Sequence, residues 1–208
     1  MDKLPENQLL DWAVRLQAIA QNGLAYTENI YDIERWEQLR DISAEMISWQ
    51  YDTPIEKVKE VFCFEKGYQT PKIDTRGVIV KDGKILLVQE STGEWAMPGG
   101  WVDVYESIGE SVVKEVWEEA GLQAKAERII AVQDRDKRNP PPFIYKICKI
   151  FVLCTALGGE FKPNSETLAS GYFGPDGLPK LCTAKTTEQQ IRMCLAAAED
   201  ENWRVQFD

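Results

Sequence analysis

Three glutamates near the middle of the chain have the spacing of a metal-binding group. On a helix that turns about 100° per residue, Glu115, Glu118 and Glu119 would present their carboxylates on one face. Like charges this close destabilise a fold unless cations or raised carboxylate pKa values compensate them. Oxygen donors suit Mg²⁺ or Mn²⁺, and the sequence contains no histidine, which argues against zinc. The spacing therefore predicts a magnesium site in which Mn²⁺ can substitute.

The element that must carry these carboxylates is a helix beginning after Ser107 and ending at Gly121. Ser107 and Glu110 have the spacing of a capping box, and glycine commonly ends a helix. An adjoining apolar stripe predicts that a neighbouring face packs against the fold: Ile108, Val112, Val116 and Ala120. The preceding Met-Pro-Gly-Gly-Trp segment, residues 97–101, predicts an irregular loop. Its glycines, Gly100 among them, would let the backbone approach a metal or a phosphate closely.

The whole array reads Gly-x5-Glu-x7-Lys-Glu-Val-x-Glu-Glu-x-Gly-Leu over residues 100–122 and resembles the Nudix box. The alternative, a solvated glutamate-rich helix, would match this pattern by chance at on the order of 10⁻⁸ per starting position. The resemblance implies that the three glutamates bind metal and that Glu106 pairs with residue 114 to hold the loop. The family has Arg where this chain has Lys114. Because Lys cannot make a forked contact, we expect reduced loop rigidity more than impaired metal binding.

The sequence around the box alternates β-rich and helical segments. Residues 75–80 and 84–89 read as strands joined by an Asp82-Gly83 hairpin turn. Residues 129–132 and 145–155 read as further strands, and residues 187–198 as a helix with three apolar side chains inward: Ile191, Cys194 and Leu195. Together with the resemblance, this order predicts an α/β fold. Its form would be a Nudix α/β/α sandwich with a mixed sheet, preceded by a small all-α domain.

Two helical patterns come before the β-rich part, at residues 6–22 and 31–48. The first repeats Leu9, Trp12, Ala13, Leu16, Ile19 and Ala20, and the second repeats Ile33, Trp36, Leu39, Ile42 and Met46. We expect a helical domain at 1–68 and a Nudix domain at 69–208. The helical segment is similar to the N-terminal domain of Nudix hydrolases of X-linked nucleoside diphosphates. A helical pair buries little core alone, so it should dock on its own catalytic domain, on a second subunit, or both. Substrate recognition and homodimerisation are its expected roles.

Composition restricts the expected cellular location and the expected binding partners. No apolar run approaches the roughly 20 residues that cross a bilayer, and no apolar segment typical of a signal peptide follows Met1. Five scattered cysteines without CxxC spacing predict buried, reduced thiols and a cytoplasmic location. The net charge of −10 argues against binding polymeric nucleic acid, and a small nucleotide remains the expected partner.

The expected reaction is metal-assisted hydrolysis of a diphosphate bridge in a nucleoside diphosphate linked to X. Glu119 is one candidate to activate the water, and Glu166, on a later loop, is the other. Expected substrate contacts are Arg76, Gln89 and Trp101, and the aromatic residues that could stack on a base are Trp12, Trp36, Tyr31 and Trp101. For the aromatic residues of the helices, packing in the core is the alternative.

CDP-choline and ADP-ribose are both candidate substrates, and the resemblance of the N-terminal segment favours CDP-choline slightly. Two alternative functions stay open. One is a nucleoside triphosphate house-cleaning pyrophosphatase, and the other is a non-catalytic nucleotide sensor built on the same fold.

Overall fold

The computed structural model describes residues 7–208, which form two compact units. The first unit contains the described residues up to Pro71 together with Pro142–Tyr145, and the second contains Lys72–Pro141 and Lys146–Asp208. The chain thus leaves the helical unit just after the boundary expected at residue 68. The return of Pro142–Tyr145 to the first unit was not expected from the sequence. Within residues 7–208, none of the helices has the length and apolar character needed to cross a bilayer.

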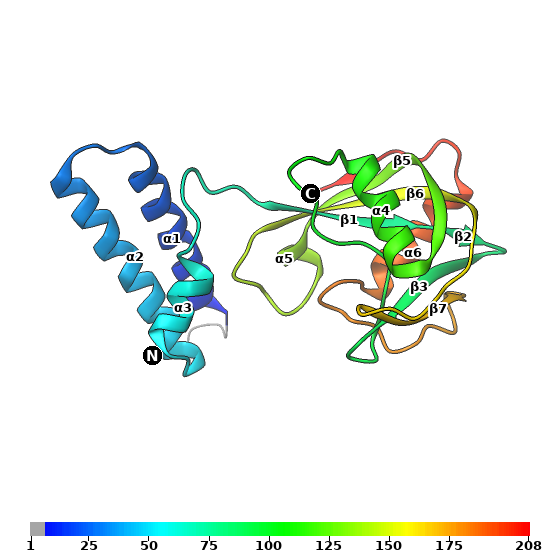
Figure 1. Ribbon diagram of the computed structural model, residues 1–208, viewed down its shortest axis with the longest axis horizontal. Helices are drawn as coiled ribbons and strands as arrows, with labels where there is room; N and C mark the ends of the chain where they lie inside the picture. Colours follow the sequence, from blue (N-terminus) through cyan, green and yellow to red (C-terminus); the bar gives the residue numbers. More distant parts are fainter. Residues whose placement is uncertain (1–6) are drawn as a thin grey trace. The chain divides into compact units, whose positions relative to one another are not determined.

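The first unit is built from three helices, of which α1 and α2 run side by side in Figure 1. These are α1 (Gln8–Tyr26), α2 (Ile30–Tyr51) and α3 (Ile55–Phe62). The Asn29 side chain caps α2 by accepting from the N–H groups of Tyr31 and Asp32. Both expected helices exist. The first extends past its expected end, and the second extends past both ends of its expected range, whereas α3 was not predicted. Glu6, the expected first residue of the first helix, lies outside the described residues.

The core of the helical unit uses only part of the apolar repeat expected for α1. The buried apolar side chains are Leu10, Ala13, Val14, Ala44, Ile47, Val58 and Phe62. Trp12 and Ile19 are instead 39% and 53% exposed, and Ile42 of α2 is also exposed. Alanines form part of the contact between the helices, and the buried Gln17 donates to the Phe62 carbonyl at 3.1 Å. Of the repeat in the first helix, Ala13 and Ala20 are therefore buried, whereas Trp12 and Ile19 lie at the surface.

The second unit contains two four-stranded sheets. The first has the order β1-β6-β5-β8: β1 (Lys72–Val78), β6 (Ile147–Gly159), β5 (Leu122–Asp134) and β8 (Gln206–Phe207). It is mixed, because β1 runs parallel to β6 and β5 runs antiparallel to β6. In the second sheet β3 pairs with each of the others: β2 (Val80–Lys81), β3 (Lys84–Glu90), β4 (Trp95–Ala96) and β7 (Thr167–Phe173).

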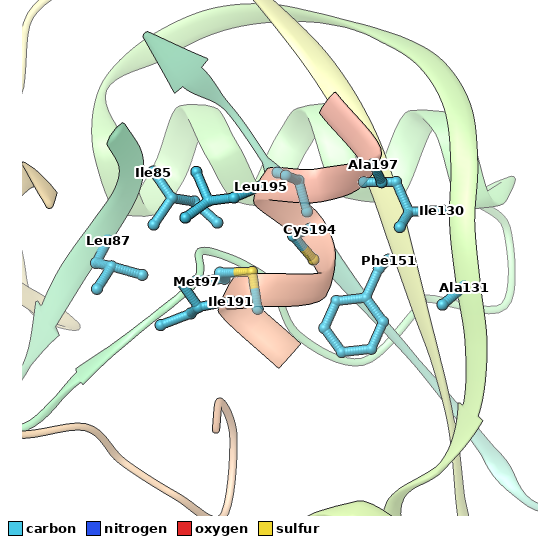
Figure 2. Close-up of a cluster of buried hydrophobic side chains, with 11 residues drawn as sticks. Ile85, Leu87, Met97, Ile130, Ala131, Phe151, Ile191, Cys194, Leu195 and Ala197 are labelled. Carbon is cyan, nitrogen blue, oxygen red and sulfur yellow. The ribbon is translucent and has the colours of Figure 1, made fainter. Parts of the chain in front are cut away.

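Two helices cover these sheets from opposite sides, as the alternation along the strands requires. In β6, Phe151 packs in the core with α6 (Glu188–Glu199), while Ile150 and Val152 pack with α4 (Ile108–Ala120). Figure 1 shows α4 against β1, β5 and β6. Figure 2 shows Cys194 of α6 pointing toward Phe151. The mixed sheet and the α/β/α arrangement are confirmed, and Ile191, Cys194 and Leu195 lie in the core as expected.

The expected hairpin is only partly correct. Asp82 and Gly83, with φ of 52° and 69°, form its turn, but only Val80 and Lys81 pair with β3. Upstream, β1 pairs in parallel with β6 along its whole length. The remaining elements, β4, β7, β8 and the short helix α5 (Arg135–Arg138), were not predicted.

Candidate active site

The helix that carries the three glutamates forms as its capping residues predict. Ser107 and the side chain of Glu110 make both hydrogen bonds of a capping box at the start of α4. At the other end Gly121 has φ of 68°, and its N–H donates to the Trp117 carbonyl. The predicted apolar stripe packs inward, with Val112, Val116 and Ala120 fully buried.

The glycine loop before α4 is held along the free edge of β1 by three backbone hydrogen bonds. Their donors are the N–H groups of Gly77, Thr75 and Val102, and their acceptors the carbonyls of Pro98, Gly100 and Ile73, at 2.8, 2.9 and 3.0 Å. Gly99 has φ of 144°, and a Cβ on it would lie 1.9 Å from the Thr75 carbonyl oxygen. Only glycine fits there, so β1 and this loop position the site together.

Two of the three carboxylates face this loop. Glu119 is 8% exposed, and its Oε2 accepts from the Gly99 N–H at 2.8 Å. Burial raises the pKa of Glu119 to about 7. The half-buried Glu115 lies against Gly100, where an added Cβ would be 3.0 Å from Oε1, and burial followed by repulsion from Glu118 raises its pKa. Burial is the main cause of both raised pKa values, and a cation bound beside these carboxylates would favour their charged form.

The three carboxylates do not, however, converge as closely as expected. Across residues 7–208, no three acidic or thiol side chains stand near enough together to form a ready-made metal cluster. Glu119 is engaged by Gly99, Glu118 is exposed, and the Gly100 carbonyl accepts from Thr75. The donor set still fits Mg²⁺, which uses only one or two carboxylates alongside water and phosphate oxygens. The oxygen donors present therefore suit a hard cation.

Lys114 keeps the ion pair that the resemblance implies. Its Nζ lies 2.8 Å from Glu106 Oε1 and 2.8 Å from Asp103 Oδ2, and these two hydrogen bonds raise the pKa of the lysine. The second oxygen of Glu106, Oε2, is buried and has no hydrogen-bond partner. The ammonium of Lys114 thus contacts one oxygen of Glu106 and one of Asp103, whereas a guanidinium could contact both oxygens of Glu106.

Arg76 lies beneath the loop and is not exposed to a substrate. Its Nε and Nη2 donate to the two Asp74 oxygens at 2.8 and 2.6 Å, and its Nη1 donates to the Met97 carbonyl at 3.2 Å. This geometry differs from the expected substrate contact and favours a positioning role. Asp74 was missed, although two residues apart on a strand share a face and could have suggested the pair.

The other expected contacts differ in whether their side chains are free to meet a substrate. Gln89 donates to the Gly93 carbonyl at 3.0 Å and so closes the turn between β3 and β4. Its side chain therefore has a structural partner, in contrast to the expected contact with a substrate. Trp101 follows Gly100 directly and is 49% exposed. Glu166 is exposed on the loop before β7, where its charge contributes to the raised pKa of Glu115 after burial and Glu118. Trp101 and Glu166 thus remain candidates for contact with a substrate.

Comparison with known proteins agrees with this geometry. The NUDIX domain model matches residues 71–193, and a model described as the UDP-X-like, N-terminal oligomerisation domain matches residues 7–62. The candidate ADP-ribose pyrophosphatase YjhB of Bacillus subtilis (strain 168) is 37% identical over 204 residues, with 98% of each chain covered.

Two crystal structures resemble the chain over different lengths. An ADP-ribose pyrophosphatase from Streptococcus suis 89-1591 is 52% identical with a TM-score of 0.64, covering 67% of this chain and 100% of that one. A UDP-X diphosphatase is 32% identical with a TM-score of 0.63, covering 98% of this chain and 100% of that one. The chain therefore belongs to the Nudix family, as a pyrophosphohydrolase that carries a UDP-X-like N-terminal domain.

Proposed function

We propose that this protein is a Mg²⁺-dependent pyrophosphohydrolase of nucleoside diphosphates linked to X. It would release a nucleoside monophosphate and phosphorylated X. The observation that carries the proposal is the pair of carboxylates, Glu115 and Glu119, that pack against the glycine loop and whose pKa values are raised by burial. The names of the relatives favour ADP-ribose as the substrate, and CDP-choline, which the N-terminal resemblance favoured, remains the second candidate.

The residues of the site have different proposed roles. Glu115, Glu118 and Glu119 would hold Mg²⁺, which when bound supplies charge stabilisation to a phosphoryl group. The Gly99 N–H orients the Glu119 carboxylate, and Lys114 with Glu106 holds the loop. Water would attack one phosphorus while the bridging P–O bond breaks, and the water's proton would pass to Glu119 or Glu166. The bridging oxygen leaves with the second phosphate.

The test is a substrate panel containing ADP-ribose, CDP-choline, a UDP-sugar, ATP and an oxidised nucleoside triphosphate. Each compound is incubated with the protein in Mg²⁺, in Mn²⁺ and in chelator, and the products are separated by chromatography. We expect monophosphate release from a diphosphate conjugate, abolished by chelator. Cleavage of triphosphates alone would favour the house-cleaning function, and nucleotide binding without hydrolysis would favour a sensor.

The helical unit supports the proposal of a homodimer. On α1 the exposed Trp12, Ile19 and Tyr26 are seven residues apart, and on α2 the exposed Ile42 and Trp49 have the same spacing. Side chains at this spacing line one side of a helix and are typical of a helix–helix seam. We define these five residues as the outer seam. A second copy of this chain is its proposed partner, with substrate recognition as a second role of the helical unit.

We also propose a cytoplasmic location. All five cysteines are free thiols in the structure, although only Cys154 and Cys194 are buried and the other three are partly buried, unlike the expectation. Free thiols persist most readily in a reducing compartment.

A further inference from the structure

The loop between β6 and β7, Glu160–Glu166, is attached to the end of α4 at both of its own ends. At its start the backbone passes so close to Gly121 that an added Cβ would lie 2.3 Å from the Glu160 carbonyl oxygen. At its end two side chains reach the same helix. Asn164 Nδ2 donates to the Glu118 carbonyl, and Thr167 Oγ1 donates to the Glu119 carbonyl, both at 2.8 Å.

These two carbonyls are ones that an ending helix leaves without partners. The last four carbonyl groups of an α-helix have no N–H donor within the helix, and α4 ends at Ala120. Asn164 and Thr167 supply the missing donors. Because Thr167 is almost fully buried, its hydroxyl is shielded from competing water. The loop is therefore hydrogen-bonded to the helical turn that carries two of the proposed metal ligands.

Asn164 links that turn to the backbone of Glu166. While its amide nitrogen donates to the helix, its Oδ1 accepts from the N–H groups of Glu166 and Thr167, both at 2.9 Å. The Asn164 N–H in turn donates to the Thr167 carbonyl at 3.1 Å, which closes the turn. One side chain thus sets where the Glu166 backbone lies relative to Glu118 and Glu119.

We propose that Asn164 is a positioning residue, which fixes the backbone of Glu166 relative to the last turn of α4 so that Glu166 can accept the proton of the attacking water. The inference rests on the proposed hydrolysis and deepens it, because it selects Glu166 over Glu119 for the proton transfer. Thr167 secures the same loop from its buried side. The Glu166 carboxylate is close enough to contribute to the raised pKa of Glu115, which agrees with this placement.

The test is a double-mutant cycle on the full chain with Asn164→Ala, Glu166→Gln and the double variant, measured with the best substrate of the panel. We expect Asn164→Ala to lower kcat by roughly 10- to 100-fold with KM within about twofold, as for a misplaced proton acceptor. The double variant should be no slower than Glu166→Gln, because Asn164 acts through Glu166. Ser165→Ala, an exposed change in the same loop, is the matched control and should leave kcat unchanged.

The variant Asn164→Asp distinguishes the two kinds of hydrogen bond that Asn164 makes, those within the loop and the one to the helix. Aspartate keeps the acceptor for the Glu166 N–H and loses the donor to the Glu118 carbonyl, so we expect it to be as slow as Asn164→Ala. Multiplying effects in the double variant, wild-type activity of Asn164→Asp, or full activity of Glu166→Gln beside a slow Asn164→Ala would each overturn the proposal.

Amide hydrogen exchange supplies a measurement that does not depend on turnover. The Glu166 and Thr167 amides should be protected in the wild-type protein and lose protection in Asn164→Ala, while the amides of α4 before its last turn stay protected. Unprotected amides in the wild-type protein would overturn the positioning role whatever the activity. Protected amides in a protein that hydrolyses nothing on the panel would instead overturn the proposed function.

Discussion

At the scale of single residues, Glu119 combines burial, a backbone hydrogen bond and a raised pKa in one carboxylate. Glutamine in its place would keep an acceptor for the Gly99 N–H and would remove the buried charge. We therefore expect Glu119→Gln to lower kcat by about 10²-fold or more, through loss of a metal ligand, while Tm stays the same or rises. Steady-state kinetics and a thermal melt measure both. The exposed Glu201→Gln is the control, and near-full activity of Glu119→Gln would refute its role.

Lys114 leaves one oxygen of Glu106 buried without a partner, and an arginine there could bond both oxygens. We expect Lys114→Arg to raise Tm by about 2 °C and to raise turnover modestly, because the loop would be held by a forked contact. Differential scanning fluorimetry in the presence and absence of Mg²⁺ measures the first effect. Lys125→Arg, at an exposed pair with Glu127, is the control. Equal shifts of Tm in the two variants would show that the unpaired Glu106 oxygen does not affect stability.

At the scale of elements, the loop against β1 depends on Gly99. An alanine there would place its Cβ on the Thr75 carbonyl, so β1 and the loop would have to separate. We expect Gly99→Ala to lower the free energy of unfolding by about 3 kcal/mol or more. Gly83→Ala is the matched control, since Gly83 also has positive φ and its Cβ would meet nothing within 4 Å. That change should cost about 1 kcal/mol. Equal losses in urea unfolding would contradict the steric argument.

We expect buried Lys149 of β6 to make the stability of the fold depend on pH. It is buried with its Nζ donating to the Lys185 carbonyl at 2.5 Å, and burial followed by the charge of Arg76 lowers its pKa from 10.5 to about 7. Between pH 7 and 10.5 the unfolded chain therefore binds more protons at this group than the folded chain does. Stability from this lysine should rise with pH through that window, by on the order of a few kcal/mol, and reach its lowest level below pH 7.

Urea unfolding of the wild-type protein and of Lys149→Met at pH 7, 8.5 and 10 tests this expectation. The difference in unfolding free energy between the two proteins should shift toward the wild type as pH rises, since methionine does not titrate. A difference that stays constant with pH would show that Lys149 remains charged in the folded state.

The sequence predicted elements wherever local chemistry determines them. Caps and periodicity located α4 and α6, and the Asp82-Gly83 turn was correct. Local chemistry could not show that β1 pairs with β6, which is some 70 residues away, because strand pairing depends on distant partners. It likewise predicted the position of Arg76 on a strand and missed its burial, since the pair with Asp74 depends on what covers that face. Periodicity also could not distinguish the core face of α1 from a face left for a partner.

At the scale of the whole molecule, the outer seam predicts a dimer that one charged substitution in the seam would dissociate. We expect the wild-type protein to be a dimer by light scattering at micromolar concentration. Ile19→Glu should shift it toward monomer, because a carboxylate would be buried at the seam. Leu157→Glu, an exposed apolar position on β6, is the control and should stay dimeric. A monomeric wild-type protein, or a dimeric Ile19→Glu, would place the contact elsewhere or remove it.

Because the Pro142–Tyr145 segment belongs to the helical unit, no single cleavage of the chain divides it into the two units. Tyr145 donates its hydroxyl to the Val61 carbonyl at 2.6 Å, and Ile144 packs on the helical core, although both follow about half of the second unit in the chain. During synthesis the helical unit therefore emerges first and lacks part of its own structure until residue 145 has left the ribosome.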